Sequence, residues 1–414
     1  MSDATDAAAA HAELIRALVS GERRFHALPE GLTADEAATI RRVALEQRLG
    51  VDLSKTGDYV LDATTAADRH CENMIGATQI PVGVAGPIAV RGQHAEGDFY
   101  VPLATTEGAL IASINRGCAA IRAAGGALVH VEDVGITRAP VFRTSGLEQT
   151  RALLDWVEAN EEQMRAVAEG TSRYLRLLDV RTFAIGTTVF LRFRFSSGDA
   201  MGMNMATIAC DRVVHELVEP ATGVACIALS GNYCVDKKPS AVNFQHGRGK
   251  RLQAEVVLDA DVLQKLKTTA AQLVQVQYRK NLLGSIAAGS IGYNAHFANV
   301  LAAFFLATGQ DPAHVAEASM GVTTIEPHGE DGVIASVFLP DAPVAAVGGG
   351  TGLATQREAL AILGVVPDPE RPGAAALRLA EILAATVLAG EISLMAAFTS
   401  RDLAGAHERL GRSS

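Results

Sequence analysis

The chain has 414 residues, of which 49% are hydrophobic and 5% aromatic, and its formal charge at pH 7 is −10. This length allows two or more domains with sizeable cores, and the abundance of Gly and Ala suits an enzyme that mixes helices and sheet. The negative charge argues against a general nucleic-acid-binding protein, because phosphate neutralisation needs a basic face. It does not exclude a local basic pocket for a phosphorylated cofactor.

Cysteine usage and hydropathy indicate a reducing compartment without membrane contact. The five cysteines are scattered without a C-x-x-C pair, which indicates reduced thiols in the cytosol. The N-terminus lacks the features of a signal peptide. The apolar stretch from Ala374 to Phe398 carries Arg378, Glu381 and Glu391, which indicates a buried helix rather than a membrane span. We expect a cytoplasmic protein, although a removed anchor domain would leave no trace.

The first 70 residues predict helices over Ala10–Val19 and Ala34–Leu49 and contain no catalytic constellation. The next segment, Ile80–Pro87, is an apolar run with Gly and Pro that fits buried loop and strand. From Ala104 to Gly117, a Thr-Thr-Glu-Gly start followed by spaced apolar residues predicts a helix N-terminus. Glu107 is then expected in the first helical turn, where the helix dipole stabilises a negatively charged side chain.

Residues 139–227 have the composition of a compact inserted α/β domain. The alternation from Phe190 to Phe195 predicts a half-exposed strand, and a helix with a Met stripe is expected to follow and to stop at Pro220. A Gly-containing turn lies between the two, a position that suits a pyrophosphate. The turn is not a G-x-G-x-x-G, so the Rossmann fingerprint is absent.

The segment from Ser230 to Pro239 reads Ser-Gly-Asn-Tyr-Cys-Val-Asp-Lys-Lys-Pro, and its breakers predict a loop. Asp236, Lys237 and Lys238 are adjacent, and two neighbouring ammonium groups require an anionic ligand, a carboxylate partner or both. A solvated lysine turn is the default for such a triplet. The apolar residues on both sides of the loop favour partial burial instead.

The second half of the chain contains further polar residues that are candidates for the functional site. Asp259–Val276 predicts one helix carrying Lys267, and Asp311 ends an apolar helix, as a solvated cap commonly does. Val347–Gly352 predicts a flexible backbone nest. No second ligand stands at metal spacing from His296, so we expect no metal.

Several of these motifs together resemble the hydroxymethylglutaryl-CoA reductase family, in the form shared with the eukaryotic enzymes. The likeness runs from Glu72 to His407 and includes Glu72–Gly76, Thr-Thr-Glu-Gly, the 230–239 loop and Asp-Ala-Met-Gly-Met-Asn-Met. It implies an α+β fold in which a small cofactor domain interrupts a large substrate domain. The implied parts are a helical N-terminal domain (1–75), the first part of the large CoA- and substrate-binding domain (76–138), a small NADP-binding domain (139–227), a catalytic lysine loop (228–240), and the second part of the large domain with a catalytic tail (241–414).

The resemblance also implies roles for individual residues. Lys237 would stabilise the oxyanion, His407 would protonate the CoA thiolate, and Glu107 would be the general acid, its pKa raised by Asp311 beside it. The implied substrate-binding residues are Ser113, Asn115, Arg116, Arg138, Ser230, Asp236, Lys238, Lys267, Lys280 and Asn299. The implied cofactor-binding residues are Ser172, Arg173, Tyr174, Asp199, Met201, Gly202, Met203, Asn204, Gly349 and Gly350.

The implied reaction is the four-electron reduction of hydroxymethylglutaryl-CoA to mevalonate and CoA, feeding isoprenoid synthesis. Arg173 in Ser172-Arg-Tyr174 favours NADPH over NADH. Two alternatives stay open: NAD-linked oxidation of mevalonate, and a non-catalytic sensor of CoA or nucleotide. The family also implies a homodimer or a dimer of dimers with active sites shared between subunits.

Overall fold

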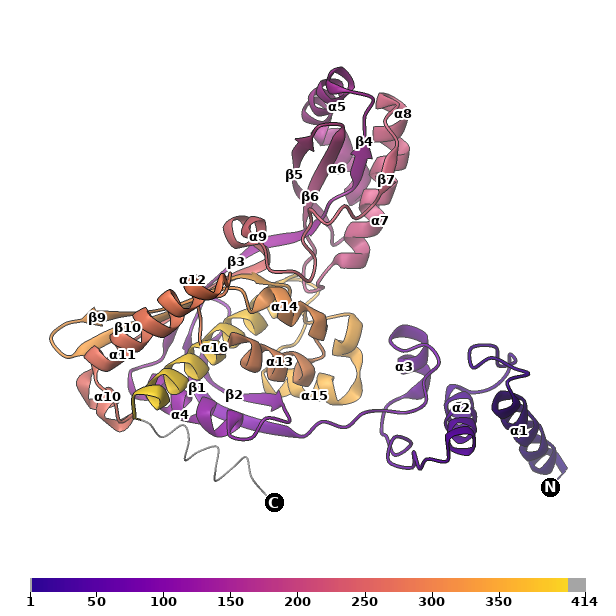
Figure 1. Cartoon of the computed structure of the whole chain (residues 1–414), viewed down its shortest axis with the longest axis horizontal. Helices are drawn as coiled ribbons and strands as arrows, with labels where there is room; N and C mark the ends of the chain where they lie inside the picture. The colour runs from indigo at the N-terminus through magenta and orange to yellow at the C-terminus, as the bar shows by residue number, and fades with distance from the viewer. Residues whose placement is uncertain (1, 401–414) are drawn as a thin grey trace.

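The structure, a computed structural model, describes residues 2–400 and consists of three parts (Figure 1). A helical N-terminal segment lies at one end of the molecule. A large domain occupies the centre, and a small domain projects from it. The mixed helix-and-sheet class predicted from the sequence is confirmed.

The N-terminal part comprises α1 (Ser2–Ser20), α2 (Ala34–Leu49) and α3 (Ala63–Arg69). Helix α2 has the predicted bounds. Thr33 and Glu36 form a capping box at its start, and Gly50, with φ 66°, ends it. Leu18 and Ile40 are buried between α1 and α2 in a small core of their own.

The large domain is built on a mainly antiparallel sheet covered by helices. Its strand order is β3-β8-β10-β9, while β1 pairs with both β2 and β3. The strands are β1 (Val82–Arg91), β2 (Glu96–Ala104), β3 (Ala127–Arg138), β8 (Arg248–Leu258), β9 (Val322–His328) and β10 (Gly332–Ala342). Between the sheet and helices α4 (Leu110–Ala123), α13 (Phe297–Thr308) and α16 (Ala374–Ser400) lies the main hydrophobic core. The shorter helices are α9 (Ala241–His246), α12 (Ser285–Ala288), α14 (Val315–Ala318) and α15 (Ala354–Ile362).

Helix α16 is the central helix of the large domain. Among the described residues, it is the one helix long and apolar enough to cross a membrane by length and composition. However, 83% of its most apolar window is buried inside the protein. Its apolar side chains are therefore used in the core, as the sequence predicts.

The single helix predicted over Asp259–Val276 is wrong. The structure has α10 (Ala260–Lys265) and α11 (Ala270–Val276), separated at Lys267, whose φ is 59°. Thr269 forms a new capping box with Gln272 and so restarts the helix. A π-helix, Gln277–Gly284, continues α11 toward α12.

The small domain has its own core, in which three α-helices and a π-helix pack against a second group of strands. Its elements are β4 (Val141–Arg143), α5 (Leu147–Ala159), α6 (Glu161–Glu169), β5 (Arg176–Ile185), β6 (Thr188–Ser196), α7 (Met203–Val213), a π-helix (Val214–Val218), α8 (Glu219–Thr222) and β7 (Cys226–Ala228). The expected stop at Pro220 is wrong. Pro220 lies in the first turn of α8, which continues the preceding π-helix without a break, and Gly223 ends that helix in the left-handed conformation.

Strand β3 joins the two domains. Its residues 128–135 pair with β8 in the large domain, and Ile136–Arg138 pair with β6 in the small domain. At the change of partner, Gly135 has φ 79°, and a Cβ there would lie 2.7 Å from Phe195 O. Arg138 is consequently placed at the boundary between the two domains.

The contact between α4 and α16 yields a test of the core. A Cβ on Gly117 would lie 1.9 Å from the backbone oxygen of Ala389, so Gly117→Ala must push two buried helices apart. We expect it to lower the free energy of unfolding by about 1–3 kcal/mol in chemical denaturation. Gly146→Ala is the control, since its methyl group would meet nothing within 4 Å. Equal stability of the two variants would contradict the packing described.

Candidate active site

The loop of residues 228–240, which we call the lysine loop, lies between β7 and α9. Asn232, Val235 and Lys237 have φ angles of 63°, 52° and 60°, in the left-handed region. Such conformations cost about 1–3 kcal/mol each and persist where surrounding contacts enforce them. Neighbouring elements, rather than local preference, therefore set the shape of this loop.

Three side chains hold the lysine loop from outside. Thr137 Oγ1 donates to Cys234 O at 2.8 Å, and Asn243 Nδ2 donates to Val235 O at 3.1 Å. The fully buried Arg248 donates from Nη2 to Asp236 Oδ1 at 2.7 Å. Asp236, predicted to contact substrate, is thus engaged by a buried guanidinium. The backbone carbonyl of Asp236 accepts a hydrogen bond of 3.2 Å from Lys238 Nζ.

Lys237 extends to Asp311, and their Nζ and Oδ2 atoms are 2.8 Å apart. The hydrogen bond to Asp311 raises the pKa of Lys237 more than partial burial lowers it. Burial pushes the pKa of Asp311 upward, but hydrogen bonds from Lys237 and from the backbone N–H of Ala313 outweigh it and hold the pKa below its usual range. Lys237 is therefore a fixed ammonium group across neutral pH.

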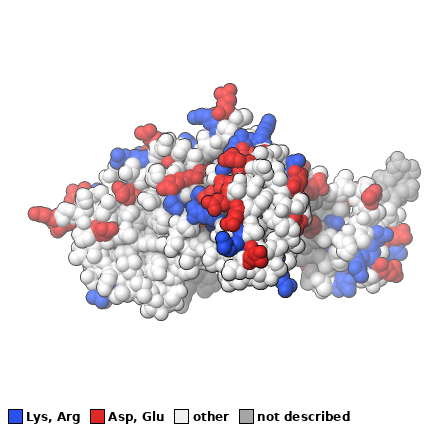
Figure 2. All heavy atoms as spheres, turned by 90° about the horizontal axis from the view of Figure 1, so that it is seen from above, with Lys and Arg blue, Asp and Glu red and all other residues white. Residues whose placement is uncertain are grey.

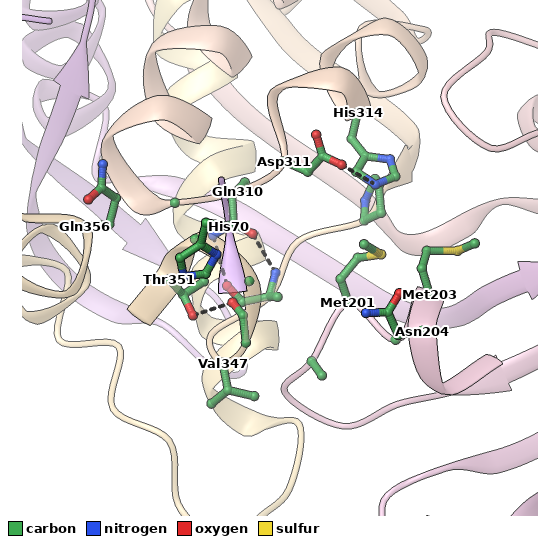
Figure 3. Close-up of a pocket in the computed structure, with 18 of the residues that line it drawn as sticks. His70, Met201, Met203, Asn204, Gln310, Asp311, His314, Val347, Thr351 and Gln356 are labelled. Atoms are coloured by element: carbon green, nitrogen blue, oxygen red, sulfur yellow. Dashed lines mark hydrogen bonds and ion pairs between the residues drawn. The ribbon is translucent and has the colours of Figure 1, made fainter. Parts of the chain in front are cut away.

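A cavity of about 780 Å³ opens beside this ion pair (Figure 3). The predicted cofactor residues Met201, Gly202, Met203 and Asn204 form one wall, and the loops containing Asp311 and Gly349–Gly350 form the other. Helix α7 begins at this wall without a side-chain cap, and Gly202 precedes it with φ 96°. Free N–H groups at a helix N-terminus attract an anionic group such as a pyrophosphate.

Two glycines bring the loops of the second wall together. A Cβ on Gly309, whose φ is 73°, would lie 2.4 Å from Gly350 O. A side chain at Gly309 would force these loops apart and displace Asp311, two residues further along the chain.

A smaller hollow of about 230 Å³ adjoins the cavity and shares Ala200, Met205 and Val347 with it. Tyr174 and Asp199 line this hollow. The guanidinium of Arg173 lies 4.6 Å from the ring centroid of Tyr174. In the same segment, Ser172 Oγ donates to Met205 Sδ at 3.5 Å. The predicted cofactor residues from two separate segments therefore meet along one continuous depression.

The side chain of Asp199 has a structural contact as well. Its Oδ1 accepts a hydrogen bond of 2.9 Å from Ala376 N in the first turn of α16. The turn predicted to bind the cofactor is thereby attached to the central helix of the large domain.

Asn299 lines a hollow of about 510 Å³ that Pro239 of the lysine loop borders. Lys280 lies outside the lining of this hollow, with Nζ 3.2 Å from Asn281 Oδ1 and 5.0 Å from the ring centroid of Phe398. Burial lowers the pKa of Lys280. The structure therefore places the expected substrate residues around the lysine loop without gathering them into one pocket.

Other predicted substrate residues contact the protein itself. Both Nε and Nη2 of Arg138 donate to Thr207 Oγ1, at 2.9 and 2.6 Å. The Oγ atom of Ser230 lies 3.6 Å from Cys234 Sγ. Lys267 is exposed at the break between α10 and α11.

The three α4 residues predicted to bind CoA are engaged within the large domain. Ser113 Oγ lies 2.9 Å from Ser393 Oγ, and Arg116 Nε donates to the same Ser393 oxygen at 3.0 Å. Asn115 Oδ1 accepts from Gly86 N at 2.7 Å. In this structure their polar groups therefore help attach α4 to α16 and to β1.

Glu107 is not where the sequence predicts it. It lies in the turn before α4, which begins at Leu110, and it is exposed. Its backbone N–H donates to Thr105 Oγ1, and within residues 2–400 no recorded contact joins it to Lys237 or Asp311. The predicted Glu107–Asp311 pair is therefore not found between the described residues of one chain. His407 lies outside the described residues.

Comparison with known proteins identifies the family. Residues 37–412 match the family model for hydroxymethylglutaryl-coenzyme A reductase. The chain belongs to the hydroxymethylglutaryl-CoA reductase family. It is 51% identical over 403 residues to the 3-hydroxy-3-methylglutaryl-coenzyme A reductase of Aeropyrum pernix, covering 97% of this chain and 96% of that protein. It is 41% identical over 409 residues to reductase 1 of Oryza sativa, covering 97% of this chain and 76% of that one.

The fold is also similar to that of solved structures of hydroxymethylglutaryl-CoA reductases. The class II reductase of Streptococcus pneumoniae, bound to NADPH in open conformations, superposes with a TM-score of 0.66 at 19% identity. The match covers 86% of this chain and 82% of that one. At this identity the similarity supports the fold alone.

Sequence reasoning missed several residues at this reductase-family site. Arg69 and His70 line the cavity from the end of α3, although the first 70 residues were expected to lack site residues. Their position just before the Glu72–Gly76 motif was the available signal. No sequence pattern indicates that Thr207 or His314 belongs to the site, because the residues that they contact are distant in the chain or are common residue types outside any motif.

One group of side chains has the spacing of metal ligands. Within the described part of the chain, Asp236, His314 and Glu317 offer ligand atoms within 4.8 Å of one another. Arg248 donates to both carboxylates at 2.7 Å, so its guanidinium already supplies positive charge there. We assign no metal to this group.

The distribution of surface charge bears on whether the protein could bind a nucleic acid. On the face shown in Figure 2, Lys and Arg side chains are interspersed with Asp and Glu. That face has no continuous basic surface of the kind that a nucleic-acid backbone requires.

The Lys237–Asp311 pair predicts a change in amine reactivity. Replacing Asp311 by Asn removes the negatively charged carboxylate that raises the pKa of Lys237, so more of the neutral amine is present at mildly alkaline pH. We expect severalfold faster acylation of Lys237 in the variant, measured by mass spectrometry of labelled peptides. The exposed Lys265 serves as the reference. An unchanged ratio of the two rates would contradict the pairing.

Proposed function

We propose that this chain reduces hydroxymethylglutaryl-CoA to mevalonate and CoA; its relatives are named as reductases of hydroxymethylglutaryl-CoA. The observation that supports this most strongly is the ammonium of Lys237, paired with Asp311 beside a cavity suited to a dinucleotide. A non-catalytic sensor would not need a lysine held in a left-handed backbone conformation against an acid.

NADPH is the proposed hydride donor. The N-terminus of α7 would hold the pyrophosphate, and the hollow at Tyr174 would take the adenosine end, with Arg173 on its 2′-phosphate. The NADPH complex of the Streptococcus pneumoniae reductase agrees with this choice. When bound, the cofactor supplies one hydride at each of two reductive steps.

The residues of the chain manage charge and protons. As the thioester carbonyl is reduced, Lys237 stabilises the oxyanion of the hemithioacetal. When the C–S bond breaks, CoA leaves as a thiolate, which His407 protonates. Glu107 then assists reduction of mevaldehyde by giving a proton to its carbonyl oxygen. Two hydrides and two protons are consumed for each molecule of mevalonate formed.

Glu107 reaches this chemistry from a second copy of the chain. Its turn is separate from the Lys237–Asp311 pair within one subunit, yet the second reductive step needs an acid near the reacting oxygen. A homodimer in which each site takes Glu107 from one subunit and Lys237 from the other meets both conditions.

The domain division given above is proposed together with this function. It is supported by the separate cores of the two domains, while the lysine loop connects β7 of the small domain to α9 of the large one. We also propose a cytoplasmic location, which five cysteines free of disulfides support.

The role of Lys237 is tested by its replacement with Ala. Loss of the fixed charge should slow both the reduction of hydroxymethylglutaryl-CoA and that of added mevaldehyde by at least about a hundredfold. Cofactor oxidation measures both rates. Lys265→Ala, on the exposed face of α10, is the control and should keep normal rates. A variant that still reduces mevaldehyde normally would show that Lys237 has no role in the second step.

Sharing of sites between subunits is tested by mixing two inactive variants. Glu107→Gln and Lys237→Ala are expected to be inactive separately. In a random mixture about half of the dimers are mixed, and each mixed dimer has one intact site, so activity should recover to about a quarter of normal. A mixture that stays inactive, with mixed dimers shown by mass spectrometry, would place both residues on the same subunit.

A further inference from the structure

Arg192 on β6 is a buried arginine of the small domain. Its neighbours along the strand, Leu191 and Phe193, belong to the core of that domain, so Arg192 lies on the opposite face of the sheet. Its side chain is only 2% exposed, and its Nη2 donates to Asn243 Oδ1 at 3.1 Å. Asn243 belongs to α9, which lies where the small domain meets the large one (Figure 1). Arg192 therefore connects β6 to the helix that follows the lysine loop.

The guanidinium of Arg192 has no recorded carboxylate partner in the described part of the chain. The acid on the same face of the sheet, Asp179, pairs with Arg181 and Arg194 at 3.3 and 2.7 Å. Arg181 lies opposite Arg192 on β5. Burial, and then the charge of Arg181, lowers the pKa of Arg192 to about 10, so it remains a cation at neutral pH. Its contact with α9 is consequently a charge-assisted hydrogen bond in a buried position.

Asn243 is fully buried, and its side-chain amide connects Arg192 to two further groups. The Nδ2 atom donates to Val235 O of the lysine loop at 3.1 Å and to Asp341 Oδ2 of β10 at 2.7 Å. A guanidinium can only donate hydrogen bonds. It therefore requires the amide oxygen on its own side, which leaves both amide hydrogens for Val235 and Asp341. Arg192 thus fixes the direction in which the amide of Asn243 points.

Val235 is the residue of the lysine loop that this amide holds. Its φ is 52°, an unfavourable value for a β-branched residue. Its N–H donates to Asn232 O at 3.0 Å, and its carbonyl accepts from Asn243. Without the second contact, Val235 could relax toward an ordinary backbone conformation. Lys237, two residues further along, would then move away from Asp311.

We propose that Arg192 is a positioning residue, which holds Lys237 against Asp311 by orienting the amide of Asn243. The proposal rests on the proposed function, in which Lys237 stabilises the oxyanion. Arg192 itself does not line the cavity beside the ion pair. It acts from the small domain on a lysine whose partner belongs to the large domain.

The position of Arg192 on β6 gives this contact a functional meaning. Strand β6 ends at Ser196, shortly before the turn of Asp199 and Gly202 that we propose binds the cofactor. One strand would therefore place both the hydride donor and, through Asn243, the ammonium group that stabilises the oxyanion. Such positioning matters because a displacement of about 1 Å can slow a reaction about a hundredfold.

The effect on Lys237 is tested without an enzyme assay. Arg192→Met keeps a long buried side chain but removes every donor. We expect Lys237 to lose contact with Asp311, so that its pKa falls and its acylation at mildly alkaline pH becomes severalfold faster. Mass spectrometry of labelled peptides measures this rate relative to that of the exposed Lys265. An unchanged ratio in the folded variant would overturn the proposal.

Arg194→Met is the matched control. Arg194 lies on the same strand and the same face, but it donates to Asp179 and to Val134 O instead of Asn243. We expect this variant to keep the wild-type ratio of labelling rates. An equal increase in both variants would show a general loosening of the small domain and would also overturn the proposal.

Enzyme kinetics supply a second measurement. Arg192→Met should lower kcat about tenfold to a hundredfold with both hydroxymethylglutaryl-CoA and mevaldehyde. The KM for NADPH should stay within about twofold, because the backbone pairing of β6 with β3 and β5 is retained. If Arg192→Met fails to fold, Arg192→Lys replaces it, since lysine keeps the charge but offers its donors from a different position. A normal kcat in the folded variant, or a change in KM alone, would overturn the proposal.

A double-mutant cycle tests whether Arg192 acts through Asn243. Asn243→Ala removes the amide that Arg192 orients, so adding Arg192→Met to it should change kcat by no more than about twofold. Losses that multiply in the double variant would show that the two residues act independently and would overturn this route.

This proposal and the proposed function fail in different ways. Absence of hydroxymethylglutaryl-CoA reduction by the folded wild type would overturn the proposed function, while the labelling comparison would still decide whether Arg192 positions Lys237. Normal reduction by the wild type combined with wild-type labelling and kcat in Arg192→Met would overturn the positioning role alone.

Discussion

The geometry of the site depends on one buried cation, Arg248. Its guanidinium is inaccessible to solvent and donates at 2.7 Å both to Asp236 of the lysine loop and to Glu317 of α14. It thereby joins β8 and the lysine loop, which are close in the sequence, to the segment after Asp311, which is distant from both. Removing one partner of such a buried pair costs about 3–5 kcal/mol, because the remaining charge is left without compensation. Together with the contacts from Thr137 and Asn243, this constraint holds the lysine loop in the shape that brings Lys237 to Asp311.

Strand β3 places this arrangement at the boundary of two domains. It pairs with β8 on the large-domain side and with β6 on the small-domain side, and Arg138 ends it. Thr207 of α7 holds Arg138, while the beginning of α7 forms the proposed pyrophosphate site. A residue expected to bind substrate is thus attached to the helix expected to bind cofactor, so a shift of the small domain would move both.

The sequence predicts local features well and distant contacts poorly. The capping box at Thr33 defines the start of α2, and the buried charges within Ala374–Phe398 indicate a core helix. Each of these two signals comes from residues that are close to one another in the sequence. The position of Glu107 before α4 was missed, since Ala109 starts that helix from a left-handed conformation without a side-chain cap. His314, Glu317 and Asp341 were missed because their chemistry comes from burial and from strands and loops that meet only in the folded chain.

The central claim is that one site carries out two successive hydride transfers around Lys237. The most direct test counts molecules of NADPH oxidised for each CoA released from hydroxymethylglutaryl-CoA, with NADH compared in parallel. Two NADPH per CoA, and much slower turnover with NADH, would agree with the site described. One NADPH per CoA would mean that the aldehyde leaves before the second transfer, and no oxidation with either cofactor by the folded protein would contradict the claim.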